Sequence, residues 1–472
     1  MSHRNSTRQS ALSWIVVGLA TMLVLLAVDG IRAADPPSYR LARFSADVTI
    51  PLNHRCMGVL PTKSKKILDP LYAHGFVLLG ADKPIVLIAF DWCEIRNGAY
   101  DQWRDALAAA AGTTRQRVLV SSLHQHDAPV IDLEAQQMLN QQGLVNELYD
   151  MKFHQQTLKR VAKACRDSLQ EAIPVTHLGL GQAKVEKVAS NRRVQREDGT
   201  VTFGRGSSSG GNAAYAAADD GLIDPWLKTI SFWNGSKPLL ALHAYATHPM
   251  SYYGRGGVTS DFVGLAREKR RRDDFSVAQI YVSGCSGDVT AGKYNDGSPD
   301  NRPVLAERMY QAMKKSWDST KKSPLRTVEF RTTELQLKFN DHEKFAAEAL
   351  KERLADSKQN IRERILAAMG LSSLQRIARG QGIEMPCLDL GEAQLVLFPG
   401  EAFVGYQLMA QKLRPDSFVM SIGYGECWPG YVPTKSAFDD NFGHSWRWVA
   451  PGAEAPMRAA RRRVLLPANK KK

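Results

Sequence analysis

Histidines and carboxylates follow several apolar runs of this chain, and these residue types suit metal binding. The clearest run is residues 118–123, which is followed by His124, His126 and Asp127. Residues two apart in a strand lie on the same face, so a strand that continued through this segment would direct both imidazoles to one side. A carboxylate would then lie beside them. A His-x-His pair alone is weak evidence, because a single histidine pair also suits an ordinary polar strand end.

Other apolar runs end in the same kinds of residue. They deliver His248, then Asp288 with Thr290, and finally Glu401 after a Pro-Gly break. In open α/β sheets, ligands gather outside the carboxyl ends of the strands. We therefore expect these residues, which are far apart in the sequence, to converge on one site.

The apolar runs alternate with amphipathic segments, which indicates an α/β fold. Residues 85–90 are apolar throughout, as in a buried strand, and residues 100–111 have helical spacing and end before Gly112. A helical hairpin, broken near Gly370 and lying over the sheet, is predicted at about 341–380. Nothing in the sequence repeats at a fixed period. We predict a mixed β-sheet core covered by helices in a single large domain.

The chain of 472 residues, 44% of them hydrophobic, is long enough to bury a large core. Two early arginines, an apolar stretch at 14–28 and small residues up to Ala33 are typical of a secretory signal peptide, predicted at 1–33. An uncleaved membrane anchor is the alternative, although the stretch is shorter than the roughly 20 residues that span a bilayer. We expect an exported protein, periplasmic or extracellular, with a folded domain at 34–457 and a basic tail at 458–472.

The formal net charge of +14 raises the question of a polyanionic partner. Much of the charge lies in short runs at 269–272, 461–463 and 470–472, and no nucleic-acid-binding motif accompanies them. We therefore predict no nucleic-acid partner, while weak attraction to anionic lipid headgroups stays compatible with the charge. The six cysteines lack CxxC spacing, which argues against zinc ribbons and redox motifs and leaves any disulfide pairing open.

Nine short blocks, taken together and in order, resemble the neutral/alkaline ceramidase family, in particular its N-terminal zinc-dependent amidohydrolase domain. They cover nearly the whole chain after the predicted signal peptide. The blocks are residues 46–51 (Ala-Asp-Val-Thr-Ile-Pro), 69–73 (Asp-Pro-Leu-Tyr-Ala), 118–126 (Val-Leu-Val-Ser-Ser-Leu-His-Gln-His), 191–193 (Asn-Arg-Arg), 245–249 (Tyr-Ala-Thr-His-Pro), 260–261 (Ser-Asp), 287–290 (Gly-Asp-Val-Thr), 399–401 (Pro-Gly-Glu) and 430–434 (Gly-Tyr-Val-Pro-Thr).

The resemblance implies a single Zn²⁺ ion held by His124, His248, Glu401 and Tyr431. Imidazole and carboxylate are ordinary zinc ligands, and three strong ligands with an open position are typical of a catalytic site. A phenol binds well only if the metal helps to deprotonate it, because its usual pKa is near 10. The alternative for Tyr431 is a tyrosine packed within a turn.

The same resemblance places His126 and Arg192 beside the metal as catalytic residues. Water activated by zinc would attack an amide carbonyl, and these two side chains would stabilise the oxyanion that develops. His126, Asp127 and Asp288 all remain candidates for the group that passes a proton to the leaving amine. The Thr290 hydroxyl is expected to donate a hydrogen bond to the substrate.

Three departures from the family pattern bear on the substrate. Residues 287–292 read Gly-Asp-Val-Thr-Ala-Gly where the family has Gly-Asp-Val-Ser-Pro-Asn. Residues 124–129 read His-Gln-His-Asp-Ala-Pro where it has His-Thr-His-Ser-Gly-Pro, which adds a charge. We also expect no immunoglobulin-like C-terminal domain. These differences affect the identity of the substrate more than the chemistry, because loops around a site set specificity.

The sequence therefore favours an exported zinc-dependent amidohydrolase that cleaves an N-acyl amide, as ceramidases do, with a small-molecule or lipid acyl amide as substrate. Two alternatives stay open: a zinc esterase or amidase acting on another acyl group, and a noncatalytic surface protein that binds a ligand on the same scaffold. A serine triad using Ser283 or Ser286 is disfavoured, because the Gly-x-Ser-x-Gly turn is missing there.

Overall fold

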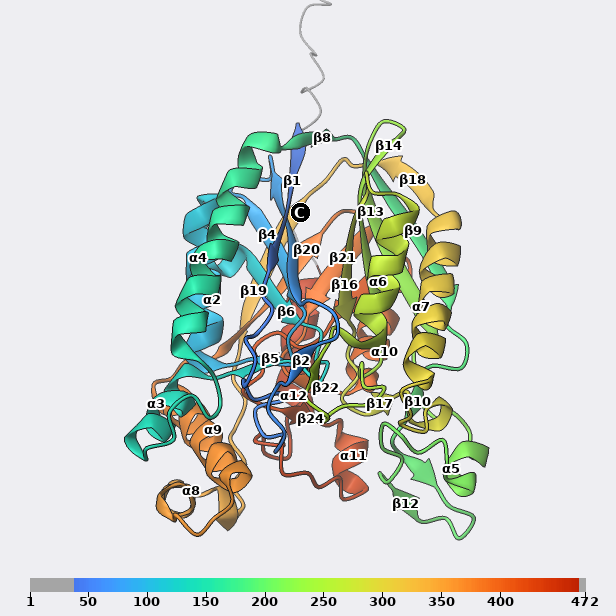
Figure 1. Cartoon of the computed structure of the whole chain (residues 1–472). Helices are drawn as coiled ribbons and strands as arrows, with labels where there is room; N and C mark the ends of the chain where they lie inside the picture. Colours follow the sequence, from blue (N-terminus) through green and yellow to red (C-terminus); the bar gives the residue numbers. More distant parts are fainter. Residues whose placement is uncertain (1–37, 467–472) are drawn as a thin grey trace, which may run out of the picture. The chain divides into compact units, whose positions relative to one another are not determined.

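Three sheets form the centre of the computed structural model, which describes residues 38–466 (Figure 1). The first sheet has the order β6 (Val118–Ser122), β4 (Ile85–Phe90), β3 (Tyr72–Leu79), β1 (Tyr39–Asp47) and β8 (Ile173–Val175). The second has the order β16 (Ala278–Ser283), β14 (Lys237–Tyr245), β13 (Trp226–Asn234), β9 (His177–Lys184) and β18 (Lys321–Pro324). The third has the order β19 (Glu329–Leu335), β20 (Ile383–Asp389), β21 (Ala393–Leu397) and β23 (Phe418–Ile422).

All three sheets follow the same chain path. Three strands pair antiparallel in succession, and a helix then leads to a fourth strand that lies parallel to the third. The connecting helices are α2 (Asn97–Ala111), α6 (Asp261–Asp273) and α10 (Val404–Leu413). A second helix then packs against the first strand of each unit: α4 (Met151–Ser168), α7 (Asn301–Asp318) and α12 (Glu454–Leu465). The fold thus repeats three times, which the sequence did not reveal as a fixed period.

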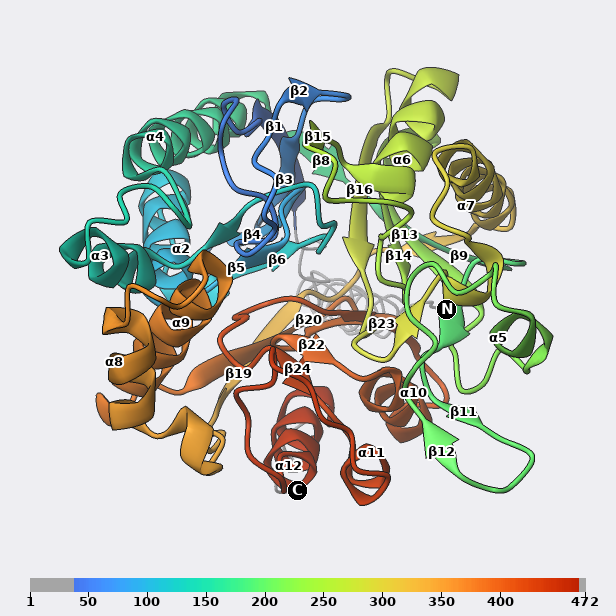
Figure 2. The ribbon, with the colours of Figure 1, turned by 60° about the horizontal axis from the view of Figure 1, so that its bottom comes forward.

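Figure 2 shows the three sheets around a common centre, with their helices on the outer side. The strand β4 is buried at every residue, because Ile85 and Leu87 pack into the core between the sheets while Val86 and Ile88 face the outer helices. Such strands read as continuous apolar runs. The mixed sheet core covered by helices is confirmed.

Short parallel and antiparallel pairs of strands lie between the larger elements. They are β2 (Lys66–Ile67) with β15 (Gly257–Val258), β5 (Glu94–Ile95) with β7 (Val130–Ile131), β10 (Ser190–Asn191) with β17 (Val289–Thr290), β11 (Val194–Gln195) with β12 (Val201–Thr202), and β22 (Glu401–Ala402) with β24 (Tyr431–Val432). Several of these short strands follow a central strand within a few residues, as β22 follows β21, and so position the polar residues after the central strand.

The helix predicted before Gly112 is confirmed, because α2 ends at Ala111 and Gly112 adopts the left-handed conformation with φ of 68°. The predicted helical hairpin corresponds to α8 (Ala347–Ala355) and α9 (Ile361–Ala378), but its break falls between the two helices and not at Gly370. Gly370 lies inside α9, where a Cβ atom would approach Leu350 to 3.0 Å. The hairpin packs beside α3 (Leu133–Gln141) and not over a sheet.

The boundary predicted at residue 458 also needs correction, because α12 crosses it. Met457, Ala460 and Val464 are buried on one side of this helix, and Arg461 is buried as well. The folded unit therefore continues at least to Leu465. The predicted signal peptide at 1–33 lies outside the described residues. Among the helices of residues 38–466, none combines the length and the apolar character needed to cross a membrane.

The remaining helices are short or peripheral. Residues 207–212 lead into α5 (Ala213–Ala217), and α11 (Lys435–Asp439) follows β24. The run of cations at 269–272 lies on α6, where Lys269 pairs with Glu307, and Arg271 and Arg272 pair with Glu268. Arg270 of the same run is buried and pairs with Asp273, so every cation of the run has an acidic partner within the protein.

Candidate metal centre

The carboxyl ends of the three parallel strand pairs meet, and the predicted metal ligands follow them (Figure 2). His124 comes two residues after β6, His248 three residues after β14, and Glu401 four residues after β21. Because three sheets contribute one residue each, no local stretch of sequence contains more than one of these ligands. The expected convergence is thus seen, although from three sheets and not from one.

Three ligand atoms face one another in this cluster. The carboxylate Oε2 of Glu401 lies 2.8 Å from Nε2 of His248 and 3.2 Å from Nε2 of His124. All three side chains are buried. Two nitrogen or oxygen ligands of a tetrahedral zinc ion lie about 3.3 Å apart, given bond lengths of about 2.0–2.1 Å. The spacing therefore suits a metal ion.

Backbone carbonyls fix the orientation of both imidazoles. Nδ1 of His124 donates to the Cys93 carbonyl over 3.1 Å, and Nδ1 of His248 donates to the Ser286 carbonyl over 2.6 Å. A carbonyl only accepts, so in each ring Nδ1 carries a proton, and Nε2 is the nitrogen that can offer a lone pair to a metal ion. Metal-binding histidines are held in this way, with the second nitrogen bonded to a carbonyl or carboxylate.

His248 and Glu401 are held in the protonation states that metals bind, whereas His124 gives up a proton more readily once a cation replaces it beside Glu401. Burial lowers the pKa of His248 to about 4, and the neighbouring Arg192 also lowers it, so this imidazole is neutral. Burial alone would lower the pKa of His124, but the Glu401 carboxylate raises it above its usual value. Burial would raise the pKa of Glu401, and the two histidines instead hold it well below its usual value. A neutral imidazole and an ionised carboxylate are the forms that metals bind.

The expectation that a strand continues through His124 and His126 and directs both imidazoles to one side is wrong. Strand β6 ends at Ser122, and His124 adopts the left-handed conformation with φ of 71°. This conformation is uncommon outside glycine and breaks the alternation of a strand. The two imidazoles still lie close together, with ring centres 5.3 Å apart, and the other side of His126 contacts Tyr253.

Tyr431 lies beside the cluster because β22 and β24 pair in parallel, with Glu401 opposite Tyr431. Its buried ring is centred 6.2 Å from the His248 ring, and the guanidinium carbon of Arg192 lies 5.5 Å from its centre. Burial raises the pKa of the phenol, whereas Arg192 lowers it. The structure therefore brings the fourth predicted ligand to the same place as the other three.

Two further predicted residues lie beside the cluster with polar atoms that the protein leaves unsatisfied. Neither ring nitrogen of the buried His126 has a hydrogen-bond partner among residues 38–466, and the same holds for Nε of Arg192. The backbone N–H of Arg192 donates to the Asp288 carbonyl over 2.7 Å, which fixes its loop. Buried polar atoms without a partner are costly and are frequent where a ligand binds.

The side chains of Asp288 and Thr290 hydrogen-bond within the protein, whereas proton transfer and a hydrogen bond to the substrate were predicted for them. The Asp288 carboxylate accepts from the Asn191 amide over 2.9 Å and from the Val404 backbone N–H over 2.8 Å. The Thr290 hydroxyl accepts from the backbone N–H of Gly292 over 3.0 Å. Both side chains therefore hold the turns around the cluster, while the backbone of residues 288–289 bonds to the backbone N–H groups of Arg192 and His248.

Sequence reasoning missed two residues of the cluster. The ring of Tyr424 stacks on His124 at 4.5 Å, and its hydroxyl lies 2.7 Å from the Ser286 hydroxyl. Glu94 places Oε1 at 3.9 Å from Nδ1 of His124. Both follow apolar runs, β23 and β4, so the signal that found the ligands could have found them too.

The serine-triad alternative has no geometric support. The Ser283 hydroxyl donates to the Leu123 carbonyl over 2.8 Å, and the Ser286 hydroxyl pairs with Tyr424. Neither hydroxyl is bonded to a histidine nitrogen in the part of the chain that the structure describes. All six cysteines lie in that part as well, and all are buried free thiols.

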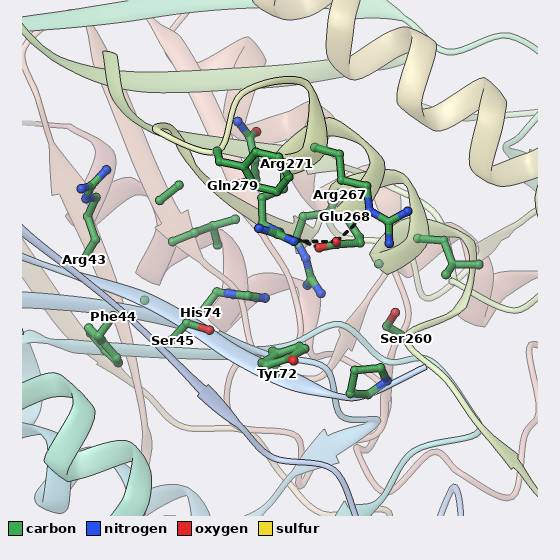
Figure 3. A pocket seen from close by; sticks show the side chains of 18 of the residues that line it. Arg43, Phe44, Ser45, Tyr72, His74, Ser260, Arg267, Glu268, Arg271 and Gln279 are labelled. Carbon is green, nitrogen blue, oxygen red and sulfur yellow. Dashed lines mark hydrogen bonds and ion pairs between the residues drawn. The ribbon is translucent and has the colours of Figure 1, made fainter. Parts of the chain in front are cut away.

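A cavity of about 860 Å³ lies elsewhere, along α6 between the first and second sheets (Figure 3). Arg43 and His74 line it from the first sheet, and Arg267 and Arg271 line it from α6. Arg267 pairs with Asp91 and Arg271 with Glu268, while Arg43 donates to the carbonyls of Leu239 and Ser276. None of the metal-centre residues lines this cavity.

Comparison with solved structures shows which known proteins share this fold. No family model matches the sequence, and no curated protein matches it. Among solved structures, neutral ceramidase from Pseudomonas aeruginosa is similar, with a TM-score of 0.66 and 15% identity over 91% of this chain and 74% of that one. A ceramidase complexed with C2 gives a TM-score of 0.66 and 14% identity over 91% of this chain and 75% of that one. The chain therefore shares the fold of these ceramidases.

Proposed function

We propose that this protein is a zinc-dependent amidohydrolase that cleaves an N-acyl amide bond. The observation that carries the proposal is the convergence of His124, His248 and Glu401, whose ligand atoms face one another in a buried cluster. The fold shared with ceramidases supports the same reaction class, although identity near 15% by itself carries only the fold.

The donor set suits zinc. Two imidazole nitrogens, one carboxylate oxygen and the phenol of Tyr431 would hold the ion, with Cys93 and Ser286 carbonyls orienting the histidines. When bound, zinc supplies a Lewis acid that polarises a carbonyl and brings the pKa of water toward about 7.

The neighbouring side chains supply the remaining functions. Burial would lower the pKa of Arg192, but Tyr431 and Glu401 raise it, so its charge is kept beside the cluster and stabilises a developing oxyanion. Burial holds the pKa of His126 well below its usual value, so the neutral imidazole can accept or donate a proton at its unpartnered nitrogens.

Two of the three candidates for the proton-transfer group are favoured. Both carboxylate oxygens of Asp288 are bonded to the protein. In contrast, Oδ2 of Asp127 is buried without a partner among the described residues, and burial raises the pKa of this carboxyl to about 6. Asp127 and His126 therefore suit proton transfer to the leaving amine better than Asp288 does.

We infer that the substrate is a lipid acyl amide. The exposed ring of Tyr253 contacts His126, and the exposed Leu222 lies nearby in the chain fold, because its carbonyl accepts from the Asn191 amide next to Arg192. An apolar mouth suits an acyl chain. One of the similar structures is a ceramidase complexed with C2, which is in line with this class. Export by the predicted signal peptide at 1–33, and weak contact with an anionic membrane, belong to the same proposal.

Metal content of the purified protein tests the proposal. We expect about one zinc ion per chain, lost in His248→Ala and Glu401→Ala while both variants remain folded. The matched control is His243→Ala, which removes a buried histidine from β14 that is bonded to Thr229 and Gln279 and not to the cluster. The zinc-loaded protein should release a fatty acid from N-acyl amides such as ceramides. Absence of metal after incubation with zinc, or retention of zinc in both cluster variants, would contradict the proposal.

A further inference from the structure

Cys93 lies against the metal centre in a way that the proposed reaction does not use. It follows β4, and its Sγ lies 3.8 Å from Nδ1 of His124, whereas Glu401 lies on the Nε2 side of the same ring. The backbone holds it there, because the Cys93 N–H donates to the Pro129 carbonyl over 2.9 Å and the Ser122 hydroxyl donates to the Cys93 carbonyl over 3.0 Å. The thiol is fully buried.

A second observation on the same side is the state of His126. This side chain is 5% exposed, and neither of its nitrogens has a hydrogen-bond partner within residues 38–466. Ligand atoms of Cys93, His124 and His126 lie within 4.8 Å of one another. A buried imidazole with two unsatisfied nitrogens beside a thiol indicates a position where something binds.

We propose that Cys93, His126 and Nδ1 of His124 form a second metal position, distinct from the cluster of His124, His248 and Glu401. With bond lengths of about 2.3 Å to sulfur and about 2.0–2.1 Å to nitrogen, a tetrahedral ion separates the two atoms by about 3.6 Å. The observed separation is 3.8 Å. A thiolate with two imidazoles selects thiophilic divalent cations, of which Cd²⁺ is the suitable probe.

The two positions compete because they share His124. Its proton is on Nδ1 when Nε2 faces the first position. A cation at the second position takes the Nδ1 lone pair, so the proton of the neutral ring moves to Nε2, where the Glu401 carboxylate accepts it over 3.2 Å. The Cys93 thiol loses its proton when it binds the cation. Cadmium at the second position therefore displaces zinc from the first.

One consequence concerns activity. A cation held by His126 occupies a residue that we assign to proton transfer or oxyanion stabilisation, so thiophilic metals should inhibit the enzyme. This consequence rests on the proposed function, whereas the second metal position itself does not.

Cadmium titration of the full-length zinc-loaded protein tests the proposal. The expected result is a thiolate-to-cadmium charge-transfer band in the ultraviolet difference spectrum, which saturates at one Cd²⁺ per chain as zinc is released. Cys93→Ser and His126→Ala should lose the band, and Cys93→Ala serves if the serine variant does not fold. Cys165→Ser is the matched control, because it replaces an equally buried thiol on α4 and should keep the band.

The variant His248→Ala separates this proposal from the proposed function. It should lose zinc and keep the cadmium band, since His248 belongs only to the first position. Lack of a band in the wild-type protein, or a band that persists in the Cys93 variants, overturns the second position and leaves the first untouched. If the wild-type protein bound no zinc but showed the cadmium band, only the proposed function would be overturned.

Discussion

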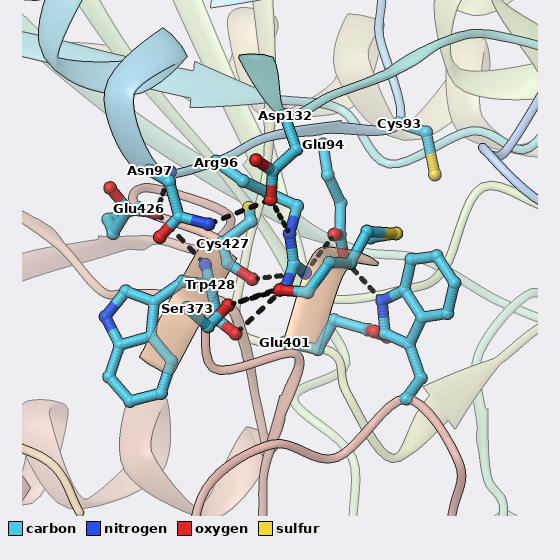
Figure 4. Close-up of polar contacts among 12 residues, drawn as sticks. Cys93, Glu94, Arg96, Asn97, Asp132, Ser373, Glu401, Glu426, Cys427 and Trp428 are labelled. Carbon is cyan, nitrogen blue, oxygen red and sulfur yellow. Dashed lines mark hydrogen bonds and ion pairs between the residues drawn. The ribbon is translucent and has the colours of Figure 1, made fainter. Parts of the chain in front are cut away.

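Two neighbouring clusters of buried charge differ in how their polar atoms are used. In the Arg96 network, the guanidinium of Arg96 donates to Glu94, Asp132, Ser373 and the carbonyls of Cys427 and Trp428 (Figure 4). In the metal cluster, Nε2 of His124 and Nε2 of His248 both face Oε2 of Glu401. Both clusters are buried, so burial does not distinguish them.

The difference lies in whether the protein itself supplies the cation between the acids. Arg96 donates to both acids and both carbonyls around it. The metal cluster brings two imidazole lone pairs toward one carboxylate, an arrangement that only a proton or a metal cation completes. Convergence of acceptors without a donor is therefore the feature that marks a functional site in this molecule.

Glu94 connects the two clusters. Its Oε2 accepts from Arg96 over 3.0 Å, and its Oε1 accepts from the Trp446 indole over 2.9 Å while lying 3.9 Å from Nδ1 of His124. Through Glu94, the Arg96 network therefore lies against the Nδ1 side of His124. A closed network of this kind holds ligands in place without taking part in binding.

The largest effect is expected from breaking the Arg96 network. Arg96→Met leaves Glu94 and Asp132 buried without their cation, and we expect a loss of about 3–5 kcal/mol in the free energy of unfolding, with or without zinc. Urea denaturation measures it. Arg193→Met is the control, because Arg193 pairs with Asp440 at the surface and should cost about 0–1 kcal/mol. Equal losses in the two variants would mean that the network does not stabilise the fold.

The metal cluster should instead respond to its ligand. Zinc at about 100 times its dissociation constant should stabilise the wild-type protein by about 2.7 kcal/mol, because it binds the folded chain. Glu401→Ala should remove this dependence and also lower the zinc-free stability, because the two histidines hold the pKa of Glu401 well below its usual value and so stabilise the folded state at neutral pH. Thermal unfolding with zinc and with chelator measures both quantities. A zinc effect of equal size in Glu401→Ala would place the metal elsewhere.

A pH-dependent effect is expected from Glu426 at the edge of the Arg96 network. Burial raises its pKa from 4.5 to about 7, although Arg376 lowers it. The folded state therefore holds the proton more tightly than the unfolded state, so stability falls as pH rises between about 4.5 and about 7. The loss between pH 5 and pH 8 should be on the order of 2 kcal/mol.

Glu426→Gln tests this contribution. Its amide oxygen can still accept from the backbone N–H groups of Asn97 and Trp428, but the group no longer titrates. Urea denaturation at several pH values should show a shallower decline in the variant than in the wild-type protein. Parallel pH profiles would assign the decline to other groups.

Much of the candidate site could be predicted from the sequence because the central strands are buried on both faces. A run such as residues 85–90 or 118–122 is then apolar without interruption, and the polar residues after it mark the carboxyl end of a strand. This signal found His124, His248 and Glu401. It did not distinguish Asp288, which follows β16 in the same way but is bonded within a turn.

Other features depend on contacts between distant parts of the chain. The three repeated units share topology without a sequence period, because each position needs only an apolar residue of suitable size. Gly370 looked like a helix break, but it allows α9 to approach Leu350. Met457, Ala460 and Val464 have helical spacing, but the arginines between them make α12 look like a basic tail. These apolar residues form a buried helix face because α12 packs on the third sheet.

The smallest effect is expected from Tyr424, which lies between the two clusters, two residues before Glu426. Its ring stacks on His124, and its hydroxyl bonds to Ser286, whose carbonyl orients His248. Tyr424→Phe keeps the stacking and removes the hydrogen bond, so we expect zinc affinity to fall about tenfold, as for other residues behind metal ligands.

Competition with a chelator measures the zinc affinity of this variant. The control is Tyr281→Phe, which removes a buried hydroxyl that donates to the Tyr245 carbonyl over 3.3 Å. Both variants should lose about 1 kcal/mol of stability, because each loses one buried hydrogen bond. Only Tyr424→Phe should bind zinc more weakly, since only its hydroxyl is connected to a metal ligand. Unchanged zinc affinity in Tyr424→Phe would mean that the two carbonyl contacts alone suffice to orient the histidines.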